Sequence, residues 1–208
     1  MPRTYRLGRR ADQLAATRER IVQATIELYT EQGISATSMP QVARRADVSL
    51  GTVINHFPTR DALEAALLER ARAEMPPPSP EIFEGLATIE DRILRLSRET
   101  GVFLDRAAPW YRMWRREPMT VGPWMEAGEA AGARWESLFR AALGSLADDL
   151  EAMAVLRAVM EPAFFESVRS GSRSTEETAD VVAAVITPWL QGLARRRQRP
   201  IDDGQRQR

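Results

Sequence analysis

Residues 49–57, with the sequence SLGTVINHF, carry the side chains best suited to recognition chemistry. At the 100° that each residue turns around an α-helix, one side is apolar and should face the core: Leu50, Val53, Ile54 and Phe57. The other side holds small or hydrogen-bonding residues without charge: Gly51, Thr52, Asn55 and His56. Reading base edges in the DNA major groove requires uncharged donors and acceptors of this kind. The alternative is a half-buried helix that caps the domain behind it.

The next helical segment differs, because its charges indicate a solvent-exposed face: Arg60, Asp61, Glu64, Glu69 and Arg70. Side chains for catalysis or metal binding are scarce. The chain has no cysteine and His56 is its only histidine, which excludes disulfides and Cys/His metal clusters. The acid pairs Asp148-Asp149 and Glu176-Glu177 are adjacent, so their members point to different sides of a helix, and first-turn acids suit the helix dipole. We therefore expect no catalytic residue, no metal and no cofactor.

The elements around residues 49–57 predict a helix-turn-helix motif over about residues 38–57. Ser38 should begin the first short helix, with Gln41 completing a capping box. Asp47 lies at the turn and tolerates a left-handed backbone, and Ser49 should cap the second helix. A preceding helix from Leu14 to Gln32 should end at Gly33.

The whole chain has helical periodicity and no long alternation typical of strands, so we expect an all-α fold. Residues 1–15 should form a basic flexible arm, because Arg3, Arg6, Arg9 and Arg10 precede every acid. Residues 16–75 would form a three-helix DNA-binding domain. The proline-rich run at 75–80 separates it from a larger helical domain at 81–197, and residues 198–208 should be a disordered tail. No apolar run approaches the length of a membrane helix, and a signal peptide is not evident, which favours a cytoplasmic protein without membrane contact.

In the larger domain we expect a helix from Ile82 to near Pro109, a short helix before Pro118, and another that begins at Gly122. Further helices should cover about 148–170, kinked at Pro162, and the segment that follows a capping box at Ser174. That last helix is apolar on too many sides for one partner, which predicts a four-helix dimer interface with 148–170. Aromatic and methionine residues are either plain core or the lining of an effector pocket: Phe103, Trp110, Met113, Trp114, Trp124, Met125 and Phe139.

Residues 18–70 resemble the DNA-binding domain of the tetracycline-repressor (TetR) family of bacterial regulators. The resemblance rests on the segments RERIVQATIELYTEQG and TSMPQVARRADVSLGTVINHFPTRDAL. It implies that Thr37, Ser38 and Arg60 contact phosphates. It also implies that a set of residues faces the major groove: Ser49, Leu50, Thr52, Asn55 and His56. Two positions depart from the family pattern, since Asp47 replaces the usual glycine and Ile54 replaces a tyrosine that commonly reaches a phosphate.

The resemblance further implies a homodimer that places two recognition helices in successive major grooves of double-stranded operator DNA, about 34–36 Å apart. A small apolar or aromatic effector in the second domain would release this repressor, with residues 59–74 as the connection. Two other functions compete with a ligand-responsive regulator. One is a helical interaction module that does not bind DNA, and the least favoured is an all-α enzyme.

Overall fold

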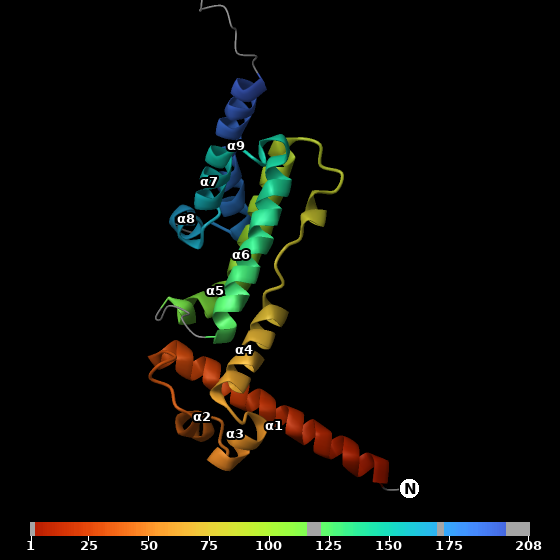
Figure 1. Cartoon of the computed structure of the whole chain (residues 1–208), viewed down its shortest axis with the longest axis vertical. Helices are drawn as coiled ribbons and strands as arrows, with labels where there is room; N and C mark the ends of the chain where they lie inside the picture. Colours follow the sequence, from red (N-terminus) through yellow and green to blue (C-terminus); the bar gives the residue numbers. More distant parts are fainter. Residues whose placement is uncertain (1–2, 116–121, 170–172, 199–208) are drawn as a thin grey trace, which may run out of the picture. The chain divides into compact units, whose positions relative to one another are not determined.

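In the part of the chain that the structure, a computed structural model, describes, the regular elements are helices joined by turns and loops (Figure 1). The described residues are 3–115, 122–169 and 173–198, with side chains from residue 11 onward, and no strand occurs among them. The all-α fold is thus confirmed. The expected tail at 198–208 lies outside the described residues except for Gln198, and so do the side chains of the arginines in the expected arm. Among the described helices, none is long and apolar enough to cross a membrane.

The helices follow one another without intervening strands in these described ranges. Their bounds are α1 Arg3–Gln32, α2 Met39–Arg45, α3 Leu50–His56, α4 Arg60–Glu74, α5 Ile89–Trp114, α6 Gly122–Leu143, α7 Leu150–Val159, α8 Pro162–Val168 and α9 Thr175–Gln198. Two short 3₁₀ helices, η1 Pro80–Phe83 and η2 Gly144–Leu146, precede α5 and α7. Helix α1 already begins at Arg3, so the backbone of residues 3–13 is helical where the sequence predicts a flexible arm.

The chain divides into two compact units. Unit 1 comprises Met1–Met75 together with Ala107–Glu129, and unit 2 comprises Pro76–Arg106 together with Ala130–Arg208. The break after Met75 agrees with the proline-rich boundary. The inclusion of residues 107–129 in unit 1 is a difference, because the sequence places that segment in the second domain. Its cause is the packing of Trp110 and Trp124 against α4, where each indole donates a hydrogen bond to a glutamate.

Unit 1 is organised around the apolar face of α1. Ile21, Ala24 and Leu28 are buried there, as the helical spacing predicts. Gly33 ends the helix with a φ of 92°, and its N–H donates to the carbonyl of Tyr29 at 3.0 Å. The chain then turns into α2, which packs against α1, and α3, which packs against α2, and both helices contribute buried residues.

Unit 2 has an apolar core to which α5, α6, α7, α8 and α9 contribute. Helix α9 packs on α7 and α8 (Figure 1) and buries Val182, Ile186 and Leu190 in this core. The capping box predicted at its start is confirmed, since the N–H of Ser174 donates to Glu177 Oε2 at 2.7 Å and the N–H of Glu177 donates to Ser174 Oγ at 3.1 Å. Val185 points away from the core and is exposed.

Three helix boundaries differ from the prediction. Helix α5 begins at Ile89 because Gly85, with a φ of 77°, separates it from η1. It then continues through Pro109, where the lost hydrogen bond is offset by the burial of Trp110 and Met113 beyond it. The expected helix at 148–170 is two helices, because Pro162 occupies the first turn of α8 and lacks the N–H that would continue α7.

Candidate nucleic-acid interface

Helices α2 and α3 form the predicted helix-turn-helix. The backbone N–H of Ser38 donates to Gln41 Oε1 at 2.8 Å, and the Ser38 hydroxyl donates to the same oxygen at 2.7 Å. At the turn, Asp47 takes a φ of 54°, the left-handed conformation expected for it. The Ser49 hydroxyl then caps α3 by accepting the N–H of Thr52 at 3.0 Å. Local sequence signals thus fix both starts and the turn between them.

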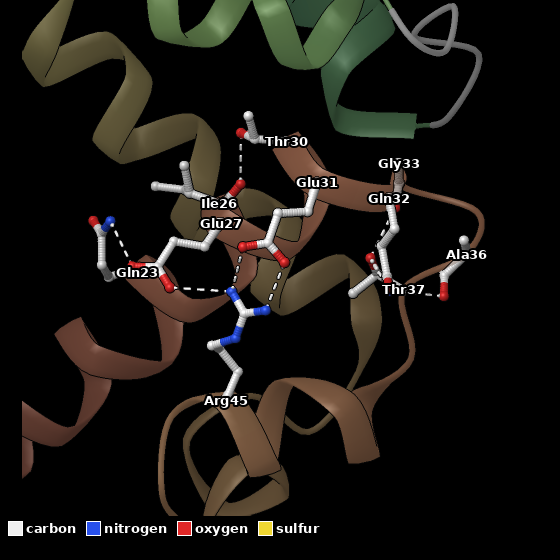
Figure 2. A network of polar contacts seen from close by, with 10 residues as sticks. All are labelled: Gln23, Ile26, Glu27, Thr30, Glu31, Gln32, Gly33, Ala36, Thr37 and Arg45. Carbon is white, nitrogen blue, oxygen red and sulfur yellow. Dashed lines mark hydrogen bonds and ion pairs between the residues drawn. The ribbon is translucent and has the colours of Figure 1, made fainter.

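Arg45, at the end of α2, links this helix to α1 through ion pairs with two glutamates (Figure 2). The two terminal nitrogens of Arg45 donate to the two carboxylate oxygens of Glu31 at 2.9 and 2.6 Å, and one of them also reaches Glu27 at 3.3 Å. The hydrogen bond from Arg45 holds the pKa of the Glu31 carboxyl below its usual value. A bidentate pair fixes direction as well as distance, so it sets the orientation of the motif on its scaffold. The sequence gives no sign of this pair, because the partners are 14 residues apart.

Thr37 and Ser38, the two residues before α2 that are predicted to contact phosphates, differ in exposure. Thr37 is buried, and its hydroxyl donates to the Gly33 carbonyl at 2.8 Å while accepting from Gln32 Nε2 at 3.2 Å (Figure 2). Its hydroxyl therefore holds the turn between α1 and α2 together. Ser38 is exposed, although its hydroxyl is bonded to Gln41. Both phosphate contacts stay predictions, and Ser38 is the more accessible of the two.

The outward face of α3 differs from the one that the sequence predicts. Val53 and Phe57 are buried as expected, but Leu50 and Ile54 are exposed. Together with Gly51 and Asn55 they form the exposed surface of the helix. Thr52 and His56 are only half-exposed, so they flank this surface instead of forming its centre. The expectation that Leu50 and Ile54 face the core is wrong, because the core contacts only the narrow edge formed by Val53 and Phe57.

Arg60, at the start of α4, is held by groups of the protein itself. Its terminal nitrogens donate to the carbonyls of Thr37 at 2.9 Å and Ile34 at 2.6 Å, and to the Tyr29 hydroxyl at 3.3 Å. Its Nε lies 3.5 Å from Glu64 Oε1. The predicted phosphate contact of Arg60 thus competes with a role in fixing the loop that leads into α2.

Glu64 is a buried carboxylate, with 3% of its side chain exposed, at the centre of a small polar cluster. It accepts hydrogen bonds from the Tyr29 hydroxyl and from Trp124 Nε1, the latter at 2.6 Å, and pairs with Arg60. The expectation that Glu64 belongs to a solvated face is wrong. One signal in the sequence favours its burial, because Glu64 lies one turn before Leu67 and Leu68, on the apolar side of the helix.

The predicted effector residues do not converge on one site. Trp110, Met113 and Trp124 are buried in unit 1, where Trp110 Nε1 donates to Glu74 Oε2 at 2.9 Å. The ring centroid of Trp114 lies 6.4 Å from that of Trp110 and 6.0 Å from that of Trp124, the second contact being edge-on. The indole N–H of Trp114 is buried without a hydrogen-bond partner among the described residues. Met125 is exposed. These contacts favour the core interpretation for Trp110 and Trp124.

Phe103 and Phe139 belong to unit 2, where each packs on Trp135 with ring centroids 5.2 and 5.7 Å apart. A surface hollow of about 530 Å³ in the same unit is lined by other residues, among them Glu136, Arg140, Asp148 and Arg157. The effector-contact assignments therefore stay predictions.

Comparison with known proteins agrees with this geometry. Residues 21–67 match the family described as bacterial regulatory proteins, tetR family. Over 55 residues the chain is 40% identical to the HTH-type transcriptional regulator SrpR of Pseudomonas putida, which covers 26% of each protein. Over 49 residues it is 43% identical to an HTH-type transcriptional repressor of Mycobacterium tuberculosis, covering 24% of this chain and 26% of that protein. The matched segment thus spans about a quarter of each of these curated relatives.

The fold agreement extends further along the chain. A TetR-like transcriptional regulator from Rhodococcus sp. RHA1 superposes with a TM-score of 0.65 over 86% of this chain and 97% of that one, at 16% sequence identity. At such low identity the likeness concerns the fold. Residues 21–67 are thus similar to the DNA-binding segment of the tetR family of bacterial regulatory proteins, and the chain as a whole shares the all-α fold of a TetR-like regulator.

Proposed function

We propose that this protein is a DNA-binding transcriptional regulator whose α3 enters the major groove of an operator. The observation that carries the proposal is the exposed and uncharged surface of α3 within a helix-turn-helix that matches the tetR family. Its helix start, turn and orientation are fixed by Ser49, Asp47 and Arg45, so the reading surface is preorganised. Asn55, exposed on this surface, supplies an amide that fits the adenine edge in a bidentate manner.

Repression, and release by a small apolar or aromatic effector, form the second part of the proposal. Support for repression comes from the relative in Mycobacterium tuberculosis that is named a repressor and matches through the DNA-binding segment. Support for an effector comes from the aromatic groups of both units and from the unpartnered indole N–H of Trp114 in the described part of the chain. A regulator of this kind responds to its effector when the two conformations differ in affinity for DNA.

A homodimer completes the proposal, because a two-fold operator requires two recognition helices. Helix α9 offers the surface for it. Val185 is 57% exposed at the edge of the buried face that Val182 and Ile186 form, and Trp189, one turn further along the helix, is half-buried. An exposed valine next to a large aromatic on a long helix is suited to packing against a symmetry mate.

The decisive experiment is selection of binding sites from a random duplex library, alongside the intergenic DNA next to the gene itself. We expect enrichment of a near-palindromic sequence, with a salt dependence that steepens by about 0.9 in log–log slope for each phosphate contact. Asn55→Ala should weaken binding to the selected site by about 1–3 kcal/mol while leaving binding to random DNA unchanged.

Gln23→Ala is the matched control, because it removes another exposed amide of unit 1, on α1. It should leave both affinities unchanged. If the wild-type protein enriches no sequence at all, the proposed function is contradicted.

A further inference from the structure

The exposed surface of α3 has an apolar component that hydrogen bonding to bases does not explain. Leu50 is 40% exposed and Ile54 is 47% exposed, while Val53, between them in sequence, is fully buried. Residues four apart lie on the same side of a helix, so the two aliphatic side chains are neighbours on the outward face. Leu50 and Ile54 together form an aliphatic pair.

The immediate surroundings of the aliphatic pair are open and uncharged. Gly51 is exposed beside it, and a Cβ built at that position would meet only Ser49 Oγ, at 3.7 Å. The absence of a side chain there leaves space for close approach of another molecule. Asn55, next to Ile54 on the same face, contributes the only side-chain amide of α3.

Two polar side chains of α3, Thr52 and His56, are only partly available for hydrogen bonds to bases. The Thr52 hydroxyl lies 2.8 Å from Ser49 Oγ, within the cap of the helix. The His56 ring is half-buried, with its centroid 6.4 Å from that of Phe57. The surface offered outward therefore consists chiefly of two aliphatic side chains, a glycine and an amide.

Only one of the four bases presents an apolar group in the major groove, and that group is the C5-methyl of thymine. Leucine and isoleucine have no donor or acceptor for the other base edges, so they discriminate through this methyl group alone. An asparagine amide matches the N6 and N7 atoms of adenine, the partner of thymine. The aliphatic pair and Asn55 are thus complementary to the two halves of an A·T pair.

We propose that Leu50 and Ile54 determine specificity by contacting thymine methyl groups, so that the part of the operator under α3 is rich in A·T pairs. This inference rests on the proposed DNA-binding function and names the base chemistry that the helix reads. Replacing either residue by a charged or polar one would remove this discrimination, but α3 would stay folded because both side chains are exposed.

The test removes single methyl groups from the DNA. A duplex selected from a random library is resynthesised with each thymine replaced in turn by deoxyuridine, which lacks only the C5-methyl group. We expect one or two positions in each half-site at which the replacement weakens binding about fourfold, the equivalent of about 0.8 kcal/mol for one buried methyl. Binding is measured by fluorescence anisotropy at constant salt, because affinity for DNA varies strongly with ionic strength.

Variants of the protein identify the contacting residues. In Ile54→Ala and Leu50→Ala, the affinity for the thymine duplex should fall, and the difference between thymine and deoxyuridine at the matching position should disappear. Leu14→Ala is the matched control, because it truncates another exposed leucine of unit 1, on α1, and should retain the full difference. Unchanged thermal unfolding of the variants excludes a folding defect.

Three outcomes are distinguishable. Failure to enrich any sequence counts against the proposed function itself. A selected site that binds equally well with deoxyuridine at every position overturns the thymine inference and leaves DNA binding intact. A methyl effect that persists in both alanine variants also overturns it, because other residues would then contact the methyl groups.

Discussion

Replacing Glu64 by glutamine tests whether the buried carboxylate holds unit 1 together. The wild-type carboxylate accepts from the Tyr29 hydroxyl and from Trp124 Nε1, and hydrogen bonds to a charged group contribute about 1.5–3 kcal/mol each. Glutamine keeps one acceptor oxygen, and its NH₂ group takes the place of the oxygen that accepts either from Trp124 Nε1 or from the Tyr29 hydroxyl, so one of these two donors loses its acceptor. The Arg60 side chain is partly exposed, so solvent screens its ion pair with Glu64 and this pair contributes little. We expect a loss of about 2–4 kcal/mol in the free energy of unfolding, mainly from the hydrogen bonds.

The matched control is Glu69→Gln on the same helix. Glu69 is paired with Arg18 at 3.6 Å, and both side chains are largely exposed, so the loss should stay below about 0.5 kcal/mol. Urea denaturation followed by circular dichroism measures both variants. Trp124→Phe removes one donor while keeping a ring in place, and its effect should be non-additive with that of Glu64→Gln. Equal stability of the Glu64 and Glu69 variants would refute the reasoning.

Alkaline stability, the dimer and the indole cluster can each be tested separately. Burial, and secondly the negative charge of Glu64, raise the pKa of Tyr29 well above its ordinary 10, so stability should be constant up to pH 10 and fall above it as the unfolded chain ionises. Because the chain has no lysine or cysteine, only three tyrosines titrate in this range, and Tyr29→Phe should flatten the decline in denaturation curves recorded from pH 9 to 11. Val185→Glu should shift the proposed dimer toward monomer in sedimentation velocity, whereas Val102→Glu, at another exposed valine of unit 2, should not; equal behaviour of the two would place the dimer contact elsewhere. Trp110→Ala should lower the free energy of unfolding by about 3–5 kcal/mol in urea denaturation, because its indole is almost fully buried, and a stable variant with weakened effector response would instead favour the pocket interpretation.

Features that depend on a few consecutive residues could be predicted from the sequence. The left-handed residues Gly33 and Asp47 and the caps at Ser49 and Ser174 all lie where their chemistry indicates. Each of them satisfies backbone groups within one helical turn, so no distant contact is needed to decide them. The helix-turn-helix could therefore be placed on the chain from these local signals alone.

Features that depend on which neighbour lies against a helix could not be predicted. A helical wheel of α3 groups Leu50 with Val53, but only packing against the remainder of unit 1 determines that the core touches Val53 and leaves Leu50 exposed. The sequence alone predicts a solvent-exposed Glu64, because its hydrogen-bond partners, Tyr29 and Trp124, are 35 and 60 residues away along the chain. Likewise the continuation of α5 through Pro109 depends on the burial of residues beyond it, which outweighs the local preference of proline.

The two indole hydrogen bonds to α4 limit the use of this DNA-binding domain as a transferable module. Residues 1–75 contain the entire helix-turn-helix but neither Trp110 nor Trp124. A fragment ending at Met75 would uncover the side of α4 that carries Glu64 and Glu74, and would leave a buried carboxylate without one of its donors. To graft the specificity of α3 onto another regulator, residues 107–129 would have to be transferred with it.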